Sequence, residues 1–343
     1  MVDLKHSKNL SAKRLGVTVG DGCQTVEHFE RCIEYGVSLV RFNLANNTIL
    51  NSLDYIYQNL MTAINKYANP SSVEVLFDIP YPRSKVRYNT FEGLQYDVKK
   101  DTILKLVNST EKMLNSRCLY VESKVFEVVS AGDTLCIGDG ELTLNVERVE
   151  RDFIEVKANN DWFVSDSKSL LIFGKEILQI SEKNENIKSI AKRYNGKKIS
   201  IALSFVEHES DILKAKEIGF ENFKSFYAKV ETQKGVDNID DITRAFDAVI
   251  VARGDLALYA GIEELGENQN KIIEASNKKN KPVFVATEIF SSLKYRDIPT
   301  RAEISDVYNL SLNIISGGFL MTKESSMNDA LQKTLEITRK LKI

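Results

Sequence analysis

The chain has 343 residues, 43% of them hydrophobic and 27% charged, which is typical of a folded globular protein large enough for one core and an inserted unit. The formal net charge of −2 provides no surplus of lysine and arginine for tracking phosphates, so no nucleic-acid partner is predicted. No apolar run approaches the ~18–20 residues of a membrane span, so no membrane partner is predicted either.

Cysteine and histidine usage limits the chemistry further. The four cysteines have no CxxC pairing and stand among apolar residues, as reduced core thiols do, which together with the lack of an apolar signal core predicts a cytoplasmic protein. The three histidines, His6, His28 and His208, lack the paired spacing of metal ligands, and we expect all three at the solvated surface. Zinc and histidine acid–base chemistry are therefore not predicted.

Eight apolar segments rich in Val, Ile and Phe alternate with amphipathic stretches, the pattern of βα units around a parallel sheet. In chain order, with the last residue of each, they are LGVTV (Val19), VSLVRFN (Asn43), VEVLFD (Asp78), ISIALSF (Phe205), FKSFYAKVE (Glu231), AVIVARGD (Asp255), KPVFVATE (Glu288) and GGFLMTKE (Glu324). Eight such units predict an α/β fold of the (β/α)8, or TIM barrel, type.

The pattern changes between the third and fourth predicted strands. From about residue 85 to 174 the hydrophobic residues alternate with a period of two, and turn signals occur at Ala131-Gly132-Asp133 and Gly138-Asp139-Gly140. This predicts a small all-β domain inserted after strand 3, acting as a lid. The predicted organisation is barrel in residues 1–84, inserted domain in 85–174, and barrel again in 175–343.

Polar residues stand at the carboxyl end of almost every predicted strand, where the chemistry of such barrels is located. They are Thr18, Arg41, Asn43, Asp78, Ser204, Lys229, Glu231, Arg253, Asp255, Thr287, Glu288, Thr322 and Glu324. Any one of them alone is more often a helix cap or a structural ion pair. Cations, carboxylates and threonines together at strand ends favour an active site.

Residues two apart on a strand share a face, so Lys229 and Glu231 are predicted to project together, as are Arg253 and Asp255. Neighbouring strands lie ~4.8 Å apart, so Glu231 and Asp255 are predicted to bind one divalent cation, Mg²⁺ or Mn²⁺. Lys229 and Arg41 would supply the positive charge that a transferring phosphoryl group needs. There is no GxxxxGK[ST] or GxGxxG motif.

The chain resembles the pyruvate kinase family over nearly its whole length, through VTVGDGCQTVEHFERCIEYGVSLVRFNLANN, KVETQKGVDNID, VARGDLAL, KPVFVATEIF and PTRAEISDVYN. The resemblance implies phosphoryl transfer between phosphoenolpyruvate and ADP. It implies that Lys229 faces the transferred group, that Arg41 binds phosphate, that Glu231 and Asp255 hold the divalent metal, and that Thr287 lies near the enol carbon that is protonated.

Further roles follow from the same resemblance. The backbone amides of Gly254 and Asp255 would hold the substrate carboxylate, with Thr287 also binding substrate. Asn43 and Asp78 would be potassium ligands. Thr18, Asn43 and Arg87 would lie on the nucleotide side, while Thr322 and Glu324 stand where the family has Ser and Glu. A homo-oligomer is implied by PTRAEISDVYN, which resembles the family's subunit-contacting segment.

The sequence also departs from the family. DIPYPRSKVR replaces the third-strand motif Asp-Thr-Lys-Gly-Pro-Glu-Ile-Arg, and Ala45 and Ile79 replace two potassium ligands. We therefore expect no potassium requirement, with Arg83 or Lys85 supplying the charge.

Other differences concern the substrate and the end of the chain. Glu288 replaces a Gln, Ala257 and Tyr259 replace Gly and Glu, and the family's C-terminal effector domain is expected to be absent. Three readings stay open: the family phosphotransferase, a relative acting on another small acid or acceptor in a specialised pathway, and a non-catalytic regulatory homologue.

Overall fold

The computed structural model describes residues 13–20, 23–67, 73–108, 118–138, 140–166, 168–173, 175, 178–180, 185–321 and 328–341. The chain divides into two compact units, one formed by Met1–Pro82 with Glu182–Ile343 and the other by Arg83–Ser181. Each is described by itself below.

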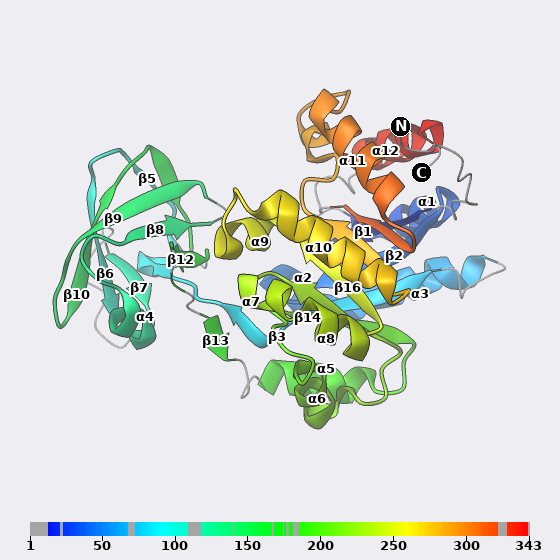
Figure 1. Ribbon diagram of the computed structural model, residues 1–343, viewed down its shortest axis with the longest axis horizontal. Coiled ribbons are helices and arrows are strands. Elements are labelled where there is room, and N and C mark those ends of the chain that lie inside the picture. The colour runs from blue at the N-terminus through cyan, green and yellow to red at the C-terminus, as the bar shows by residue number, and fades with distance from the viewer. Residues whose placement is uncertain are drawn as a thin grey trace. The chain divides into compact units, whose positions relative to one another are not determined.

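The first unit is a closed barrel of eight parallel strands, which confirms the predicted (β/α)8 fold (Figure 1). The strands are β1 (Arg14–Thr18), β2 (Val37–Asn43), β3 (Glu74–Lys85), β14 (Ile199–Ser204), β15 (Phe226–Val230), β16 (Ala248–Ala252), β17 (Val283–Ala286) and β18 (Gly317–Leu320). Each pairs with the next in this order, and β18 pairs with β1 to close the ring.

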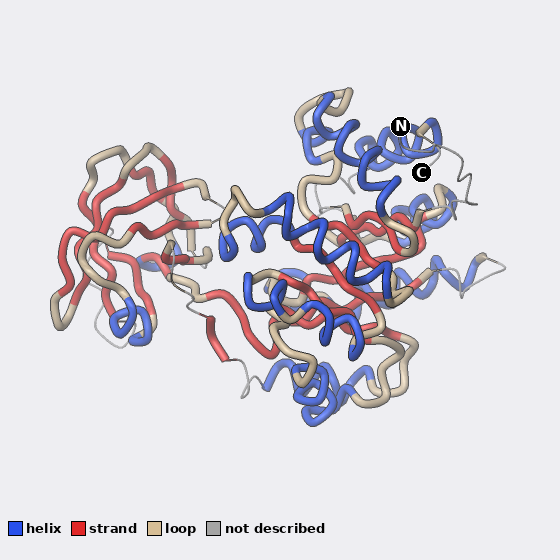
Figure 2. The backbone as a smooth tube through the Cα atoms, in the orientation of Figure 1, coloured by secondary structure: helices blue, strands red, loops and turns tan. Residues whose placement is uncertain are grey.

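Helices connect the strands and lie outside them (Figure 2). They are α1 (Val26–Glu34), α2 (Asn47–Asn51), α3 (Leu53–Lys66), α5 (Glu185–Tyr194), α6 (Asp211–Ala215), α7 (Gln233–Asp237), α8 (Ile239–Ala245), α9 (Arg253–Ala260), α10 (Leu265–Lys278), α11 (Arg301–Asn313) and α12 (Asn328–Lys340), with shorter turns η3 (Lys216–Phe220) and η4 (Ser291–Lys294). Within the described ranges, no helix has the length and apolar character needed to cross a membrane.

The alternation of side chains along each strand builds two cores. In β16, Val249 and Val251 pack outward with the helices, whereas Ala248 and Ile250 belong to the cluster inside the barrel. All five β16 residues are buried, as expected for a parallel strand covered on both faces. Burial on both faces explains why these strands read as continuous apolar runs.

Two features close the barrel at β18 and at its amino-terminal end. A Cβ at Gly318 would lie 1.9 Å from the carbonyl oxygen of Arg14, so only glycine allows β18 to approach β1 there. Arg14 also forms a 2.8 Å ion pair with the buried Glu74, whose other oxygen accepts a hydrogen bond from Ser200. These contacts tie β1, β3 and β14 together.

The second unit is built mainly of β-strands around its own apolar core. Its strands are β4 (Asn89–Thr90), β5 (Tyr96–Val98), β6 (Ile103–Asn108), β7 (Cys118–Val121), β8 (Thr134–Ile137), β9 (Leu142–Val149), β10 (Phe153–Ala158), β11 (Trp162–Val164), β12 (Leu170–Ile172) and β13 (Leu178–Ile180). Its described residues also contain a turn η2 (Phe91–Gly93) and a short helix, α4 (Ser123–Val128), which the two-residue period did not predict.

The sequence predictions for one strand end and for one histidine were wrong. Strand β16 ends at Ala252 and not at Asp255, because Arg253, Gly254 and Asp255 form the first turn of α9. His28 is only 4% exposed, because it lies on the inner face of α1 beside Cys32, although it was expected at the surface. The four cysteines are buried, as predicted for core thiols.

Candidate active site

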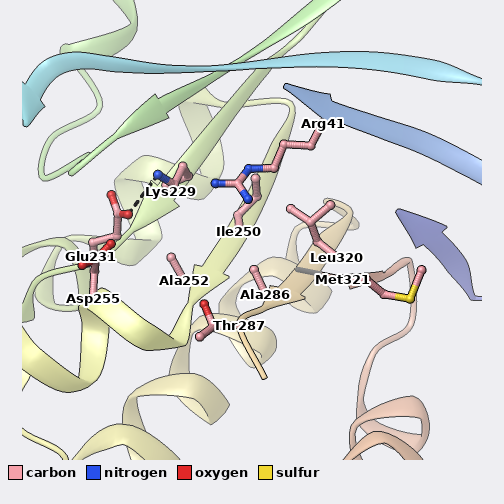
Figure 3. Close-up of a pocket in the computed structure, with 10 residues that line it drawn as sticks. All are labelled: Arg41, Lys229, Glu231, Ile250, Ala252, Asp255, Ala286, Thr287, Leu320 and Met321. Carbon is pink, nitrogen blue, oxygen red and sulfur yellow. Dashed lines mark ion pairs between the residues drawn. The ribbon is translucent and has the colours of Figure 1, made fainter. Parts of the chain in front are cut away.

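A cavity of about 80 Å³, room for an ion and a few water-sized groups, lies at the carboxyl ends of the barrel strands (Figure 3). Six of the side chains that line it are Arg41, Lys229, Glu231, Asp255, Ala286 and Thr287. They come from β2, β15, α9 and β17 or from the residues directly after them. Five of the strand-end residues predicted to carry the chemistry, Arg41, Lys229, Glu231, Asp255 and Thr287, thus line one cavity.

Lys229 is the central cation of this site. Its side chain is 11% exposed, and Nζ lies 3.0 Å from Oε1 of Glu231 and 3.2 Å from Oδ1 of Asp78. Nζ also donates a 3.3 Å hydrogen bond to Oγ of Ser204. Burial opposes the charge, but the carboxylates of Asp78 and Glu231 outweigh it and raise the pKa of Lys229 above its ordinary value. The ammonium is therefore a permanent, positioned charge.

Glu231 follows β15 directly and is fully buried. The backbone N–H of Phe205 donates a 2.6 Å hydrogen bond to Oε2, whereas Oε1 is close to Lys229 Nζ but accepts no well-aligned hydrogen bond. Burial raises the pKa of this carboxyl to about 7; Lys229 opposes that shift, and the negative charge of Asp255 adds to it. An ionised Glu231 thus still has capacity for a further positive charge.

The residues present fit a divalent cation. Glu231 and Asp255 line the same cavity, and Oε1 of Glu231 is a buried oxygen with unused acceptor capacity. Magnesium is commonly held by one or two carboxylates completed by water and substrate oxygens, so two protein ligands suffice. Clusters of three or more His, Cys, Asp or Glu side chains suited to a metal are absent from the part of the chain that the structure describes.

Asp78, at the end of the barrel portion of β3, anchors the second cation of the site. Arg41 approaches Oδ2 through Nε at 2.8 Å and Nη2 at 2.6 Å, a two-pronged contact. Oγ of Thr18 accepts from Arg41 Nη1 at 3.2 Å and donates to the carbonyl of Met321. Burial opposes ionisation of Asp78, but Lys229 and Arg41 outweigh it and lower its pKa. Asp78 thus holds both cations in place.

Thr287 begins the segment after β17 in an unusual backbone conformation. Its φ is 73° and that of Glu288 is 56°, the left-handed region that a β-branched residue rarely adopts and that costs about 1–3 kcal/mol. A Cβ at Gly254 would lie only 3.2 Å from Cγ2 of Thr287, so glycine permits the close approach of α9 to this segment.

Arg253 and Asp255 do not share a face as predicted. Because α9 begins at Arg253, the two side chains diverge: Asp255 lines the cavity, whereas the Arg253 guanidinium contacts the carbonyl of Thr287 and the carboxylate of Asp306. Lys229 and Glu231, which were also predicted to project together, are in contact. Both pairs are two residues apart, but the side chains of Arg253 and Asp255 diverge because β16 ends before them, at Ala252.

Asn43 and Arg87 are not among the residues that line the cavity. Oδ1 of Asn43 accepts a hydrogen bond from the backbone N–H of Ala45, and Arg87 is an exposed residue of the second unit. Thr322 and Glu324 lie outside the described residues. Sequence reasoning gave no role to the backbone of Phe205 or to Met321, whose contributions are main-chain contacts that residue type does not reveal.

Comparison with known proteins identifies the architecture. Residues 12–322 match the family model for the pyruvate kinase barrel domain. A pyruvate kinase of Mycobacterium tuberculosis is 28% identical over 299 residues, 86% of this chain and 62% of that protein, and one of Thermotoga maritima is 26% identical over 340 residues, 97% of this chain and 70% of that protein.

A solved structure agrees with these matches. The crystal structure of a pyruvate kinase from Cryptosporidium parvum superposes with a TM-score of 0.78 at 26% identity, covering 96% of this chain and 69% of that one. This chain spans less than two thirds of the length of the Mycobacterium relative. Fold, order of motifs and family model agree, and the chain belongs to the pyruvate kinase family.

Proposed function

We propose that the protein is a phosphotransferase that moves a phosphoryl group between phosphoenolpyruvate and ADP with a divalent metal. The observation that carries this proposal is the convergence of Lys229, Arg41, Glu231 and Asp255 on one cavity at the barrel mouth. Phosphoryl transfer depends mostly on positioning and charge neutralisation, and these four side chains supply both.

The roles of the residues follow from their surroundings. Lys229, held by Asp78 and Glu231, presents a fixed ammonium to the transferring group, and Arg41, held by the same Asp78, presents its guanidinium to the same cavity. Mg²⁺ or Mn²⁺ held by Glu231 and Asp255 would supply Lewis-acid stabilisation of phosphoryl and enolate oxygens. The Thr287 side chain, at the edge of the same cavity, would lie beside the enol carbon.

The test is the release of pyruvate from phosphoenolpyruvate with ADP and Mg²⁺, with ATP measured in parallel. Lys229→Met is the site variant, and Lys271→Met is its matched control, because Lys271 is a half-exposed residue of α10 that forms a surface ion pair with Glu267. We expect metal-dependent turnover in the native protein and the control, and turnover about 100-fold to 1000-fold lower in Lys229→Met. No pyruvate release by the native protein under these conditions would reject the proposal.

Glu288 favours a second candidate, a related enol phosphate as substrate. It is exposed directly after Thr287, so its carboxylate adds negative charge near the edge of the site. A panel of phosphoenol acids with different groups on the enol carbon, assayed against Glu288→Gln, distinguishes the two candidates. A preference that moves toward phosphoenolpyruvate in the variant would support the second one.

A further inference from the structure

Arg253 makes contacts that join three elements of the barrel. Nη1 lies 2.6 Å from Oδ2 of Asp306 on α11, while Nη2 and Nε donate to the carbonyl of Thr287 at 2.6 Å and 3.2 Å. The side chain is 12% exposed and does not line the cavity. Its charge is therefore directed away from the cavity and toward the backbone that follows β17.

That backbone is in the left-handed region, which residues other than glycine rarely adopt. Thr287, Glu288 and Phe290 all have φ between 55° and 73°. Ile289 and Phe290 are fully buried, which anchors the middle of the segment. Arg253 is the contact at its first residue, so the carbonyl of Thr287 is set by a side chain from α9.

The far end of the segment is tied to the same helix. Ser292 donates its N–H to Oε1 of Glu303 at 2.9 Å and its hydroxyl to Oε2, and Glu303 belongs to α11, as Asp306 does. The turn is therefore fastened to α11 at both ends, directly through Glu303 and through Arg253 at Thr287. A guanidinium suits the second contact, since its planar fork can serve a carbonyl and a carboxylate together.

We infer that Arg253 is a positioning residue of the reaction: held by Asp306, it fixes the left-handed turn at Thr287 and so sets the Thr287 side chain against the cavity. Gly254 shows how little tolerance there is, because the methyl group of Thr287 approaches within 3.2 Å of the position that a Cβ would occupy there. The expected effect of Arg253 on kcat rests on the proposed function, whereas its effect on the turn does not.

The geometric part is tested without activity. Hydrogen–deuterium exchange followed by mass spectrometry is measured on the full chain for the native protein, Arg253→Gln and Arg244→Gln. Arg244 is the matched control, an arginine of α8 in an exposed ion pair with Asp241. We expect exchange in residues 287–293 to rise about tenfold in Arg253→Gln, as local opening becomes easier, and to stay unchanged in Arg244→Gln. Unchanged exchange in Arg253→Gln would overturn the inference.

The kinetic part separates positioning of Thr287 from damage to the metal site. In Arg253→Gln we expect kcat to fall about 100-fold, as a misplacement of about 1 Å does, with KM for phosphoenolpyruvate and Kd for Mn²⁺ each within about threefold of native. Arg253→Lys should recover part of kcat, because an ammonium replaces one of the two contacts.

Asp306→Asn tests the same contact from α11, through a residue that is remote in sequence from Asp255. It should reproduce the same selective fall in kcat, by about fivefold to tenfold, because the guanidinium keeps its contact with Thr287 but loses its ionic anchor. Loss of Mn²⁺ affinity in both variants would show that Arg253 acts through Asp255 and would overturn the inference. If the native protein releases no pyruvate, the proposed function fails, and the exchange measurement alone decides whether Arg253 holds the turn.

Discussion

At the scale of single residues, the site concentrates charge where water is scarce. Asp78 and Glu231 are almost completely buried, and Lys229 lies between them. Buried ion pairs are weak contributors to stability, since desolvation offsets most of their attraction. Their pKa shifts, in contrast, are the kind of perturbation that functional sites show. We infer that Asp78 and Glu231 serve to keep the Lys229 ammonium in a fixed position for a ligand.

Lys229→Met should leave the protein folded and reduce kcat by about 100-fold to 1000-fold, as removal of one preorganised charge typically does. The fold should persist because Glu231, whose pKa burial already raises to about 7, can take up a proton when its cationic neighbour is lost. Circular dichroism and the pyruvate assay check the two parts. An unchanged rate would remove Lys229 from the mechanism.

Activity should be nearly the same in sodium, potassium or a bulky organic cation. Both carboxylate oxygens of Asp78 already face cations of the chain, Arg41 at Oδ2 and Lys229 at Oδ1, and Oδ1 of Asn43 accepts from Ala45. The sequence predicted Arg83 or Lys85 as the source of this charge, and that role stays a prediction, whereas the cations in contact with Asp78 are Arg41 and Lys229. Initial rates in matched chloride salts test this, and steep activation by potassium would contradict it.

At the scale of elements, strand ends show what a sequence can and cannot predict. The eight barrel strands were predictable because burial on both faces makes each an apolar run. The end of β16 was not predictable from the sequence. Nothing in AVIVARGD indicates that its last three residues form the first turn of α9 and do not continue the strand. The partner of Arg253 lies 34 residues away at Thr287, and such tertiary pairing is not encoded in local spacing.

Glu303, in the capping box that begins α11, should make stability depend on pH. Burial opposes its ionisation, but hydrogen bonds from Ser292 and Thr300 outweigh that effect and lower the pKa below the ordinary 4.5. A carboxyl with a lowered folded-state pKa stabilises the fold above its unfolded pKa, and this contribution disappears as pH falls through the folded value.

Glu303→Gln should therefore cost about 1 kcal/mol at pH 7 and less near pH 3, because the contribution of the carboxylate is lost as the pH falls from its unfolded toward its folded pKa. Urea denaturation at the two pH values measures the difference, with Glu267→Gln as the control, since Glu267 is an exposed residue of α10. An equal cost at both values would show that the charge of Glu303 is not what stabilises the turn.

At the scale of the whole molecule, α11 has an apolar outer face. Tyr308, Leu312 and Ile315 are 46%, 55% and 59% exposed, and the first two are one helical turn apart. They lie in or just after the PTRAEISDVYN stretch that resembles a subunit-contacting segment. We expect a dimer or a dimer of dimers at micromolar concentration.

Light scattering of the native chain and of Tyr308→Glu combined with Leu312→Glu tests this expectation. Charges on a buried apolar contact should shift the native assembly to monomer, whereas a strict monomer in the native protein would reject the idea.

The closure of β18 onto β1 places a constraint on synthesis of the chain. Arg14 pairs with Gly318, so the last barrel seam joins residues that leave the ribosome about 300 positions apart. Leu320 and Met321, which line the cavity, emerge only after Lys229, Glu231 and Asp255. Until then the nascent barrel exposes two unpaired strand edges, one at β1 and one at β17, the kind of surface that mispairs with other chains. Slow translation over residues 287–316 would prolong that exposure. The risk of mispairing with other chains is therefore greatest late in synthesis.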